Sequence, residues 1–529
     1  MGSSRWRQFG CLCLIAIAVS ACGAGSTTSS TKSGGGTLTI REFGDWGPTL
    51  DPARIQIGSA WGLVLSAYDT LINTDANASP VPYLADSWKV SATSVTFNLH
   101  KGVTCSDGSP LTATAVANSV NHFATKSGFA LGLMGPGPYQ VTPDDSAGTV
   151  TIGIPAANNQ LLLAFGHPDS AIVCPAGLAA GADLTTKSYG TGPYVFDSVV
   201  HGQGATMHLR KEWTWGPRGA TASKLPDQLV FKLITDETTA ANLVLSGGLD
   251  IAWINGPDIK RLLSDKSLGV VSLQAGTSNS FYFNEYPGHV TDDPQVRWAL
   301  MNTFDPKAYA IAATGGLSTT YPTAGIIGPN QNCFQPMTQY LPKHDPAVAR
   351  QILQADGYTP GSDGTMMKNG QPLTISLLAS VAVGNGPAYL SAQFQAAGVK
   401  VTLKQLDFAQ WASRYVAGTD DVVLGPPGGS NSKQPLASTL ALFTGKTPST
   451  GGQNYFDVQD PVLEQLASQV RAAAPGQDCQ YWNGFAKQLL VGYHFMPLDV
   501  TTVYWFRKPG LDYTFLLNSQ AIDPTSYHR

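Results

Sequence analysis

The feature that most constrains this fold is the succession of strand-like segments, in which apolar and polar residues alternate, and helix-like segments along the chain. "TLTIREF" (residues 37–43) and "SVTFNLH" (94–100) alternate apolar and polar side chains, the two-residue period of a β-strand. "LTATAVANSVNHFA" (111–124) instead spaces its apolar residues as a helix does, with Thr112 as a helix cap. Later, "QLVFKLITD" followed by "ETTAANLVLSGGLDIAWI" indicates strand, helix, turn and strand. This succession predicts an α/β fold with mixed sheets.

Composition indicates a large soluble body and excludes one class of partner. Hydrophobic residues make up 43% of the 529 residues and charged residues 13%, about half the usual quarter. The net charge is −4, without a basic stripe or charge block, which argues against a nucleic-acid partner. After residue 22 no apolar run reaches 18 residues, so no membrane-spanning helix is predicted in the body.

The N-terminal segment predicts export and a lipid anchor. Arg5 and Arg7 precede "CLCLIAIAV" (11–19), an apolar run too short to span a bilayer, which needs about 20 residues. Small residues follow, which completes the order of an export signal. "VSAC" (19–22) is similar to a bacterial lipobox, in which the leader is cut before a lipidated cysteine. We expect residues 1–21 to be a signal peptide and Cys22 to carry lipid; an ordinary secretory leader is the alternative.

The segment after Cys22 predicts a tether. "GAGSTTSSTKSGGG" (23–36) contains no large apolar side chain, so nothing offsets the entropy lost on ordering it. A Gly/Ser-rich chain of this length reaches roughly 20 Å. We expect residues 22–36 to hold a globular body close to the outer face of the membrane.

A long stretch of the chain resembles one known family. "LADSWKVSATSVTFNLHKGVTCSDGSPLTATAV" (84–116) is similar to the signature of the extracellular solute-binding proteins of family 5, the peptide-binding type that serves ABC importers. "GTGPYVF" (190–196), "LVLSGGLDIA" (243–252) and "FMPLDVTTVYWFRKPGL" (495–511) follow in the family's order. The positions that match the signature are Trp88, Phe97, Leu99, Gly102, Val103, Asp107, Gly108, Pro110 and Thr112.

The resemblance implies a two-lobed periplasmic-binding-protein-like fold of type II, with mixed sheets, two crossovers and an extra subdomain. We expect lobe I at residues 37–271, including a subdomain at about 62–185. Lobe II is expected at 272–496, and residues 497–529 are expected to return to lobe I. Lobes of this kind close around a solute.

Four cysteines in the exported body predict two disulfides. Three pairings are possible. Cys105–Cys174 and Cys333–Cys479 are favoured, because each pair then falls within one lobe of the implied architecture. Buried free thiols are the alternative. None of the four lies in a C-x-x-C motif, so a structural metal is not expected.

The resemblance implies solute contacts from both lobes, but one loop departs from the family. In "DDVVLGPPGGSNSK" (420–433), residues 426–430 replace the Trp and Asp with which peptide-binding relatives grip a peptide amine. That charge-assisted grip is therefore absent or moved to Asp45 or Asp421. For each aromatic candidate, core packing is the alternative. The expected ligand-binding residues are Phe43, Asp45, Trp46, Asn279, Phe281, Tyr282, Asp421, Gly428, Gly429, Ser430, Asn431 and Tyr504.

These expectations define a function without catalysis. The chain is predicted to be a monomeric, lipid-anchored receptor outside the cell membrane, passing short peptides to ABC permease subunits without a cofactor. Haem, a metal chelate or an oligosaccharide are alternative solutes, and a surface enzyme or adhesin is the alternative class. The sequence has no H-E-x-x-H or G-x-S-x-G motif, and "LALFTGKTP" (440–448) lacks the first glycine of a phosphate-binding loop.

Overall fold

The structure is a computed structural model in which Gly34–Arg529 form one compact unit. The described residues are 35–54, 60–75, 79–179, 181–274, 279–317, 326–329, 331–425, 435, 437–474, 476–499, 502–516 and 521–528. Cys22 and the loop residues Gly428, Gly429, Ser430 and Asn431 lie outside them, so their predicted roles stay predictions. Within the described ranges, every helix is too short or too polar to cross a bilayer.

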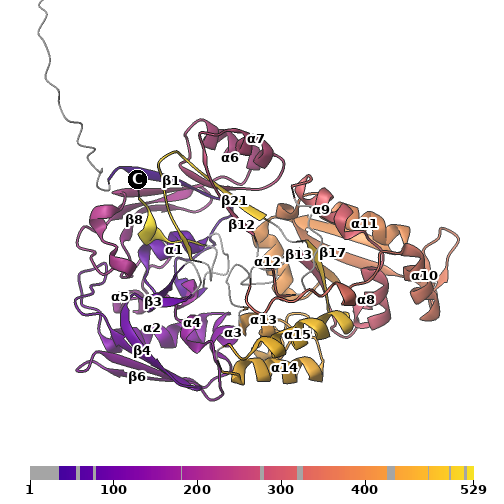
Figure 1. Ribbon diagram of the computed structural model, residues 1–529, viewed down its shortest axis with the longest axis horizontal. Coiled ribbons are helices and arrows are strands. Elements are labelled where there is room, and N and C mark those ends of the chain that lie inside the picture. The colour runs from indigo at the N-terminus through magenta and orange to yellow at the C-terminus, as the bar shows by residue number, and fades with distance from the viewer. Residues whose placement is uncertain are drawn as a thin grey trace, which may run out of the picture. The chain divides into compact units, whose positions relative to one another are not determined.

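Lobe I is built on a seven-stranded mixed sheet with the order β12-β21-β11-β1-β10-β9-β8 (Figure 1). β1 lies parallel to β10, with Thr37 opposite Gln228, and parallel to β11 on its other side. β21 inserts between β11 and β12, so the C-terminal part of the chain completes this sheet. The strands are β1 (Thr37–Glu42), β8 (Tyr194–Val200), β9 (Gly204–Leu209), β10 (Gln228–Leu233), β11 (Ile251–Ile254), β12 (Gly269–Gln274) and β21 (Thr502–Arg507).

Two helices and a small core cover one part of this sheet. α6 (Glu237–Leu245) begins after Asp236, whose side chain accepts a hydrogen bond from the Thr239 N–H. α7 (Asp258–Ser264) follows β11. The buried residues between these elements are Ala240, Ala241, Val244, Leu249, Ala252, Ile254, Ile259, Leu262 and Phe506.

An inserted subdomain follows β1 and carries a four-stranded antiparallel sheet, in the order β4-β5-β7-β6. Thr112 caps α2 as predicted, because its Oγ1 accepts a hydrogen bond from the Ala115 N–H at 3.1 Å. The apolar residues of the subdomain and the seven-stranded sheet form one continuous core. The elements are α1 (Trp61–Ala67), β2 (Ile72–Thr74), β3 (Pro80–Pro82), β4 (Ala85–Val90), β5 (Ser94–Leu99), α2 (Ala113–Lys126), α3 (Ala130–Met134), β6 (Gln140–Asp144), β7 (Thr149–Gly153), α4 (Leu161–Ala164) and α5 (Pro175–Leu178).

Lobe II is built on a five-stranded sheet with the order β18-β17-β19-β13-β20 and has its own large core. Its strands are β13 (Asn279–Phe283), β17 (Thr374–Ser380), β18 (Lys400–Leu406), β19 (Val422–Gly425) and β20 (Phe495–Asp499). Its helices are α8 (Pro294–Met301), α9 (Pro306–Thr314), α10 (Pro346–Ala355), α11 (Gly386–Ala396), α12 (Phe408–Ala417), α13 (Ala437–Ala441), α14 (Pro461–Ala472) and α15 (Cys479–Val491). Short strands complete the chain: β14 (Thr359–Pro360), β15 (Met366–Lys368), β16 (Gln371–Pro372), β22 (Phe515–Leu516) and β23 (Ala521–Ile522).

The chain passes twice between the two large sheets. It leaves β12 at Gln274 and enters β13 at Asn279, and it leaves β20 at Asp499 and enters β21 at Thr502. Two lobes joined by two crossovers confirm the predicted α/β architecture.

Both disulfides pair as predicted. Cys105 is bonded to Cys174 within the inserted subdomain, and Cys333 is bonded to Cys479 at the start of α15 in lobe II. Each therefore closes a loop inside one lobe, and neither joins the lobes.

Candidate functional site

A row of aromatic side chains lies at the carboxyl end of β1, next to the parallel strand β11. Phe43 meets Trp253 edge-on, with ring centroids 4.3 Å apart. Trp253 stacks on Trp505 at 6.4 Å because β11 and β21 pair with these two residues opposite each other. Phe515 extends the row, 5.3 Å from Trp505. Phe43, Trp253 and Trp505 are only partly buried, so the row offers some exposed aromatic surface.

One polar atom in this aromatic row has no hydrogen bond. The Nε1 of Trp253 is buried and has no partner in the structure. A buried donor without an acceptor is unfavourable, so a carbonyl or hydroxyl oxygen of a solute would be a suitable partner. The nearby guanidinium of Arg41 is not available to bind an anionic solute, because it already contacts both carboxylate oxygens of Glu237, at 2.9 and 3.0 Å.

A pocket lies where both lobes and both crossovers meet, and we call it the hinge pocket. Asn279 and Thr502, the first residues of β13 and β21, both line it. Its polar side chains are amides and hydroxyls, all of them uncharged, set against apolar ones. The lining residues are Asn255, Gly256, Ile259, Asn279, Ala313, Thr314, Leu317, Val383, Thr502 and Tyr504.

The structure brings together two of the predicted contacts and places Phe43 in the aromatic row. Asn279 and Tyr504, 225 residues apart in the sequence, both line the hinge pocket. Asn279 belongs to lobe II and Tyr504 to lobe I, so the hinge pocket is lined from both lobes.

Asp45 and Trp46 pack against the turn between β8 and β9. The Asp45 Oδ2 accepts a hydrogen bond from the Gly202 N–H at 3.0 Å. Trp46 is only 2% exposed and lies 5.7 Å from the His201 ring, although its Nε1 has no partner. In this arrangement Trp46 offers a solute almost no surface.

Phe281 and Tyr282 are fully buried in the core of lobe II. Tyr282 stacks on Phe456, with ring centroids 4.8 Å apart and planes within 3°, while Phe281 packs against Phe304 and Phe394 on the other face of the strand. β13 lies between β19 and β20. Phe281 meets Phe394 of α11 and Tyr282 meets Phe443 and Phe456, so both neighbouring side chains enter the core. Neither has surface to offer a solute here.

Asp421 lies directly before β19, and both of its carboxylate oxygens have hydrogen-bond partners within lobe II. Oδ2 accepts hydrogen bonds from the N–H and Oγ of Ser376 at 2.8 and 2.7 Å, and Oδ1 lies 2.7 Å from the Nδ1 of His289. Gly425, which leads into the altered loop, stands at the other end of β19. Asp421 therefore stabilises the sheet of lobe II in this structure.

Trp253, Trp505 and Asn255 were missed by the reasoning from sequence. "IAWI" was interpreted as a strand, but nothing local shows that Trp253 pairs with a residue 252 positions later. Within the described residues, the one group with metal-ligand composition is Cys333, Asp478 and Cys479, and its two sulfurs are joined in a disulfide.

Comparison with known proteins gives one family. The profile of the bacterial extracellular solute-binding proteins, family 5 (middle region), matches residues 79–450. The glutathione-binding protein of Pectobacterium atrosepticum is 26% identical over 446 residues, which cover 79% of this chain and 82% of that protein. A probable peptide ABC transporter periplasmic-binding protein of Sinorhizobium fredii is 25% identical over 324 residues, 58% of this chain and 61% of its own length.

Solved structures agree with the fold. A substrate-binding protein from Microbacterium hydrocarbonoxydans, complexed with 4-hydroxybenzoate hydrazide, is 29% identical with a TM-score of 0.80, covering 93% of this chain and 99% of that chain. A dipeptide-binding protein from Pseudoalteromonas, in complex with Met-Leu, has a TM-score of 0.79 at 17% identity, covering 93% and 100%, and shows the fold alone.

The profile match covers well over half of the chain, and the two-lobed architecture agrees with it. It confirms the expectation of a binding protein rather than an enzyme. The chain belongs to the bacterial extracellular solute-binding proteins of family 5.

Proposed function

We propose that this chain is the lipid-anchored substrate-binding protein of an ABC importer, capturing short peptides or related small solutes outside the membrane and passing them to permease subunits. The observation that carries the proposal is the hinge pocket, a cavity of about 50 Å³ to which both lobes and both strands that follow the crossovers contribute. A peptide is larger than this cavity, so it would enter with the lobes further apart. A solute that contacts both lobes favours their closed arrangement through its higher affinity for it. The names of the glutathione- and peptide-binding relatives support this solute class.

A second candidate solute is a small uncharged aromatic molecule. The aromatic row offers flat rings and the unpaired N–H of Trp253. The relative complexed with 4-hydroxybenzoate hydrazide, at 29% identity over nearly the whole chain, supports it. Haem, a metal chelate and an oligosaccharide are further candidate solutes, and the binding screen described next includes them.

A thermal-shift screen tests the proposal. The panel contains peptides of two to six residues, glutathione, 4-hydroxybenzoate hydrazide, haem, nickel–histidine and short oligosaccharides. A solute at 100 times its Kd stabilises the protein by roughly 2.7 kcal/mol, which is a measurable shift in Tm. If no member of the panel shifts the Tm, the proposed solute classes are wrong.

Two matched variants then locate the bound solute. Trp253→Phe removes the unpaired N–H but keeps a ring, and Tyr504→Phe removes a hydroxyl from the hinge pocket. Trp298→Phe is the control, because Trp298 stacks on Tyr493 in lobe II at 4.6 Å and lies outside the pocket. Tyr504→Phe is expected to weaken the binding of a peptide, and Trp253→Phe is expected to weaken the binding of an aromatic solute. Equal effects of all three variants would contradict both locations.

The lipid anchor has its own test. Cys22→Ala is expected to move the protein from the membrane fraction to the medium, because the cysteine thiol is the point of lipid attachment. Unchanged membrane retention would contradict the anchor without affecting the solute site. A tether beside the permease raises the local concentration of the receptor there.

A further inference from the structure

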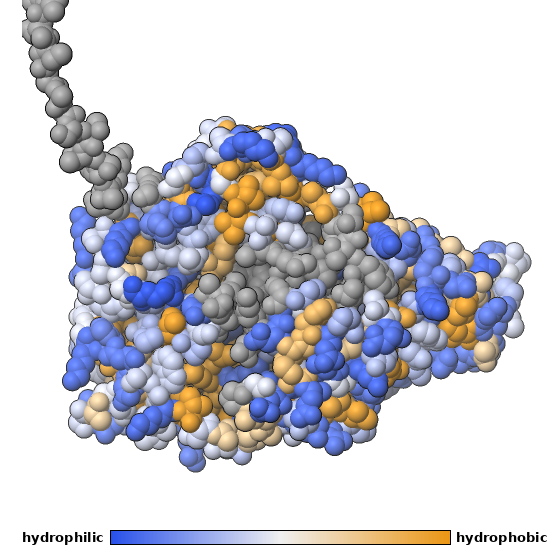
Figure 2. All heavy atoms as spheres, in the orientation of Figure 1, coloured by the Kyte–Doolittle hydropathy of each residue, from blue (hydrophilic) through white to orange (hydrophobic). Residues whose placement is uncertain are grey.

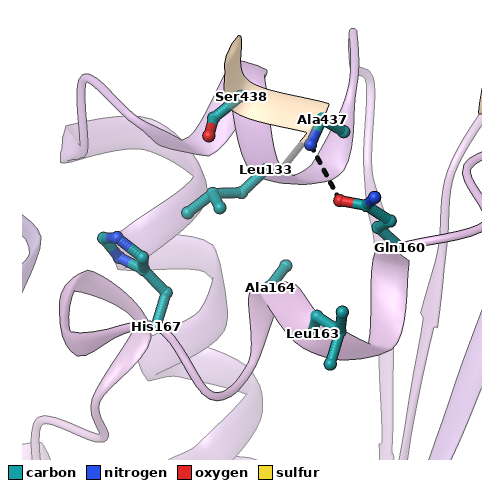
Figure 3. Close-up of a pocket in the computed structure, with 7 residues that line it drawn as sticks. All are labelled: Leu133, Gln160, Leu163, Ala164, His167, Ala437 and Ser438. Atoms are coloured by element: carbon teal, nitrogen blue, oxygen red, sulfur yellow. Dashed lines mark hydrogen bonds between the residues drawn. The ribbon is translucent and has the colours of Figure 1, made fainter. Parts of the chain in front are cut away.

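Three amide side chains join the inserted subdomain to lobe II, and we call Asn159, Gln160 and Gln453 the clasp. Gln160 uses both ends of its amide: its Nε2 donates to the Pro435 carbonyl at 2.7 Å, and its Oε1 accepts from the Ala437 N–H at 2.8 Å. Gln160 is 7% exposed. Figure 3 shows its amide directed at the start of α13. One subdomain side chain thereby fixes a stretch of lobe II backbone.

The other two residues of the clasp also bond across the lobes. Gln453 of lobe II donates from Nε2 to the Gly128 carbonyl of the subdomain. Asn159 donates its backbone N–H to the Arg471 carbonyl at 3.0 Å and its Nδ2 to Asp478 at 3.4 Å. Bonds therefore run in both directions, and most of their partners are backbone groups.

Close approach of the two backbones accompanies these bonds. α3 packs against α13. A Cβ on Gly132 of α3 would stand 3.1 Å from the Ser438 Cα and would collide with the Gln453 amide oxygen. A side chain at position 132 would hold the two helices apart, so glycine permits this contact.

Hydrogen bonding across the clasp is incomplete. The Oδ1 of Asn159, the Oε1 of Gln453 and the Nε of Arg471 are buried without partners. Each unpaired buried group carries a desolvation penalty. The bonds that favour contact are therefore partly offset, which leaves a small net preference for it. A contact with a small net preference can open and close.

The pocket beside the clasp does not explain these contacts as a solute site. His167 and Gln160 stand on opposite sides of it, with Leu133, Leu163, Ala164, Ala437 and Ser438 completing the wall (Figure 3). The space holds no more than about one water molecule. Burial lowers the pKa of His167 to about 3, so the imidazole is uncharged and the clasp has no ionic bond at this point.

We propose that Gln160 is a positioning residue for solute capture, whose two hydrogen bonds to lobe II set how readily the lobes close on a solute bound elsewhere between them. The inference rests on the proposed receptor function. Gln160 acts through the relative position of the lobes, because it does not line the hinge pocket. The apparent Kd rises as the fraction of closing-competent protein falls.

The experiment compares two variants with a matched control. Gln160→Ala removes both bonds, and Gln160→Glu keeps the acceptor for Ala437 but loses the donor to Pro435. Gln405→Ala is the control, because the Gln405 Nε2 bonds Gly384 within lobe II at 2.9 Å. Small-angle scattering of the solute-free protein measures lobe opening, and hydrogen exchange at the Ala437 amide measures the clasp. A fixed panel of dipeptides is used for affinity.

Gln160→Ala is expected to increase the radius of gyration, to speed exchange at Ala437 and to weaken dipeptide binding about tenfold, the size expected for two neutral hydrogen bonds. Gln160→Glu should weaken the clasp at least as much as Gln160→Ala, because its buried carboxylate would face the Pro435 carbonyl without a partner for its charge. Because no ion pair is involved, the increase should persist at high salt.

A lower Tm in Gln160→Ala without a larger radius or faster exchange than in Gln405→Ala would overturn the proposal, since that result describes a merely structural residue. If no dipeptide binds the wild type, the peptide proposal fails, while scattering and exchange still decide whether Gln160 controls opening.

Discussion

The buried carboxylate of Asp69 in lobe I and the amides of the clasp between the lobes differ in how fully they are hydrogen-bonded. Asp69 is completely buried, and its carboxylate accepts hydrogen bonds from Tyr83 and from the indole N–H of Trp215 at 2.9 Å, with Trp213 at 3.5 Å. Burial raises the pKa of Asp69, and these donors oppose the shift. The clasp, by contrast, leaves the amide oxygens of Asn159 and Gln453 unpaired. Both oxygens of Asp69 therefore have donors, whereas two of the three clasp amides leave their oxygen unpaired.

Lobe II contains a buried charged network of its own, although the Nε of Arg297 has no partner. His494 bonds Glu285 at 2.7 Å and Asp460 at 3.3 Å, while Arg297 lies 3.2 Å from the other oxygen of Glu285. All four belong to lobe II. Each lobe therefore contains a buried network built on carboxylates, whereas the clasp side chains are uncharged amides.

The largest effect is expected from removing a disulfide inside a lobe. Replacing both Cys105 and Cys174 with Ser opens a 69-residue loop and should lower the unfolding free energy by about 4 kcal/mol, measured by urea denaturation. Lobe opening should not change, because the bond does not join the lobes. A scattering profile as expanded as that of Gln160→Ala would contradict this separation.

Asp69→Ala should lower the unfolding free energy by about 3 kcal/mol, because it leaves the Tyr83 hydroxyl and the Trp215 indole N–H buried without an acceptor. Asp69→Asn is the control: it keeps the shape and one oxygen and should cost clearly less. Urea denaturation of both variants checks this. If Ala and Asn are equally harmful, the hydrogen bonds do not explain the stability.

The His494 network should make stability depend on pH. Burial alone lowers the pKa of His494, but hydrogen bonds to Asp460 and Glu285 outweigh it and the net pKa is raised. The hydrogen bond from His494 lowers the pKa of Asp460 well below its usual range, against burial. The folded state therefore holds the His494 proton more tightly than the unfolded state does. This contribution is complete below the ordinary histidine pKa of about 6.5 and is lost as the pH rises through the raised value.

The contribution of Asp460 has the opposite sign: it is present above about pH 3.9 and is lost in acid. The difference in unfolding free energy between wild type and His494→Gln should therefore be largest near pH 5 and shrink toward pH 9. Denaturation at a series of pH values measures it. A difference that stays constant over this range would show that the network does not bind the proton as described.

The smallest effect is expected at the boundary. Asn159→Ala removes a long hydrogen bond of 3.4 Å together with an unpaired oxygen, and these losses nearly cancel. The unfolding free energy should change by less than about 0.5 kcal/mol. A loss as large as that in Asp69→Ala would place the clasp among the permanent contacts and weaken the comparison.

Local sequence patterns predicted the elements well. The alternating segments at 37–43 and 94–100 became β1 and β5 within one residue, and Thr112 caps α2 as expected. Strand and helix periods are local properties, so they can be interpreted without knowledge of the fold. The disulfide pairing followed from the implied lobes and is confirmed.

The candidate site was predicted less completely. Asn279 and Tyr504 are expected to contact solute, and they meet in the hinge pocket. Phe281 and Tyr282 are expected to do so because their segment crosses to lobe II, but the alternation of a strand does not show whether one face or both are covered. Here both faces of β13 are covered, and both rings are buried. Figure 2 shows hydrophilic and hydrophobic residues interspersed over one face of the molecule. Surface hydropathy on this face therefore does not locate a binding site.

The sequence by itself determined the strands, the helices, the caps and the α/β class, because these depend on spacing over a few residues. The tertiary structure decided which distant residues meet. It stacks Trp253 on Trp505, brings Asn279 to Tyr504 and fixes the lobe II backbone through Gln160. Such contacts depend on sheet order and on how two cores face each other, and no local pattern encodes either.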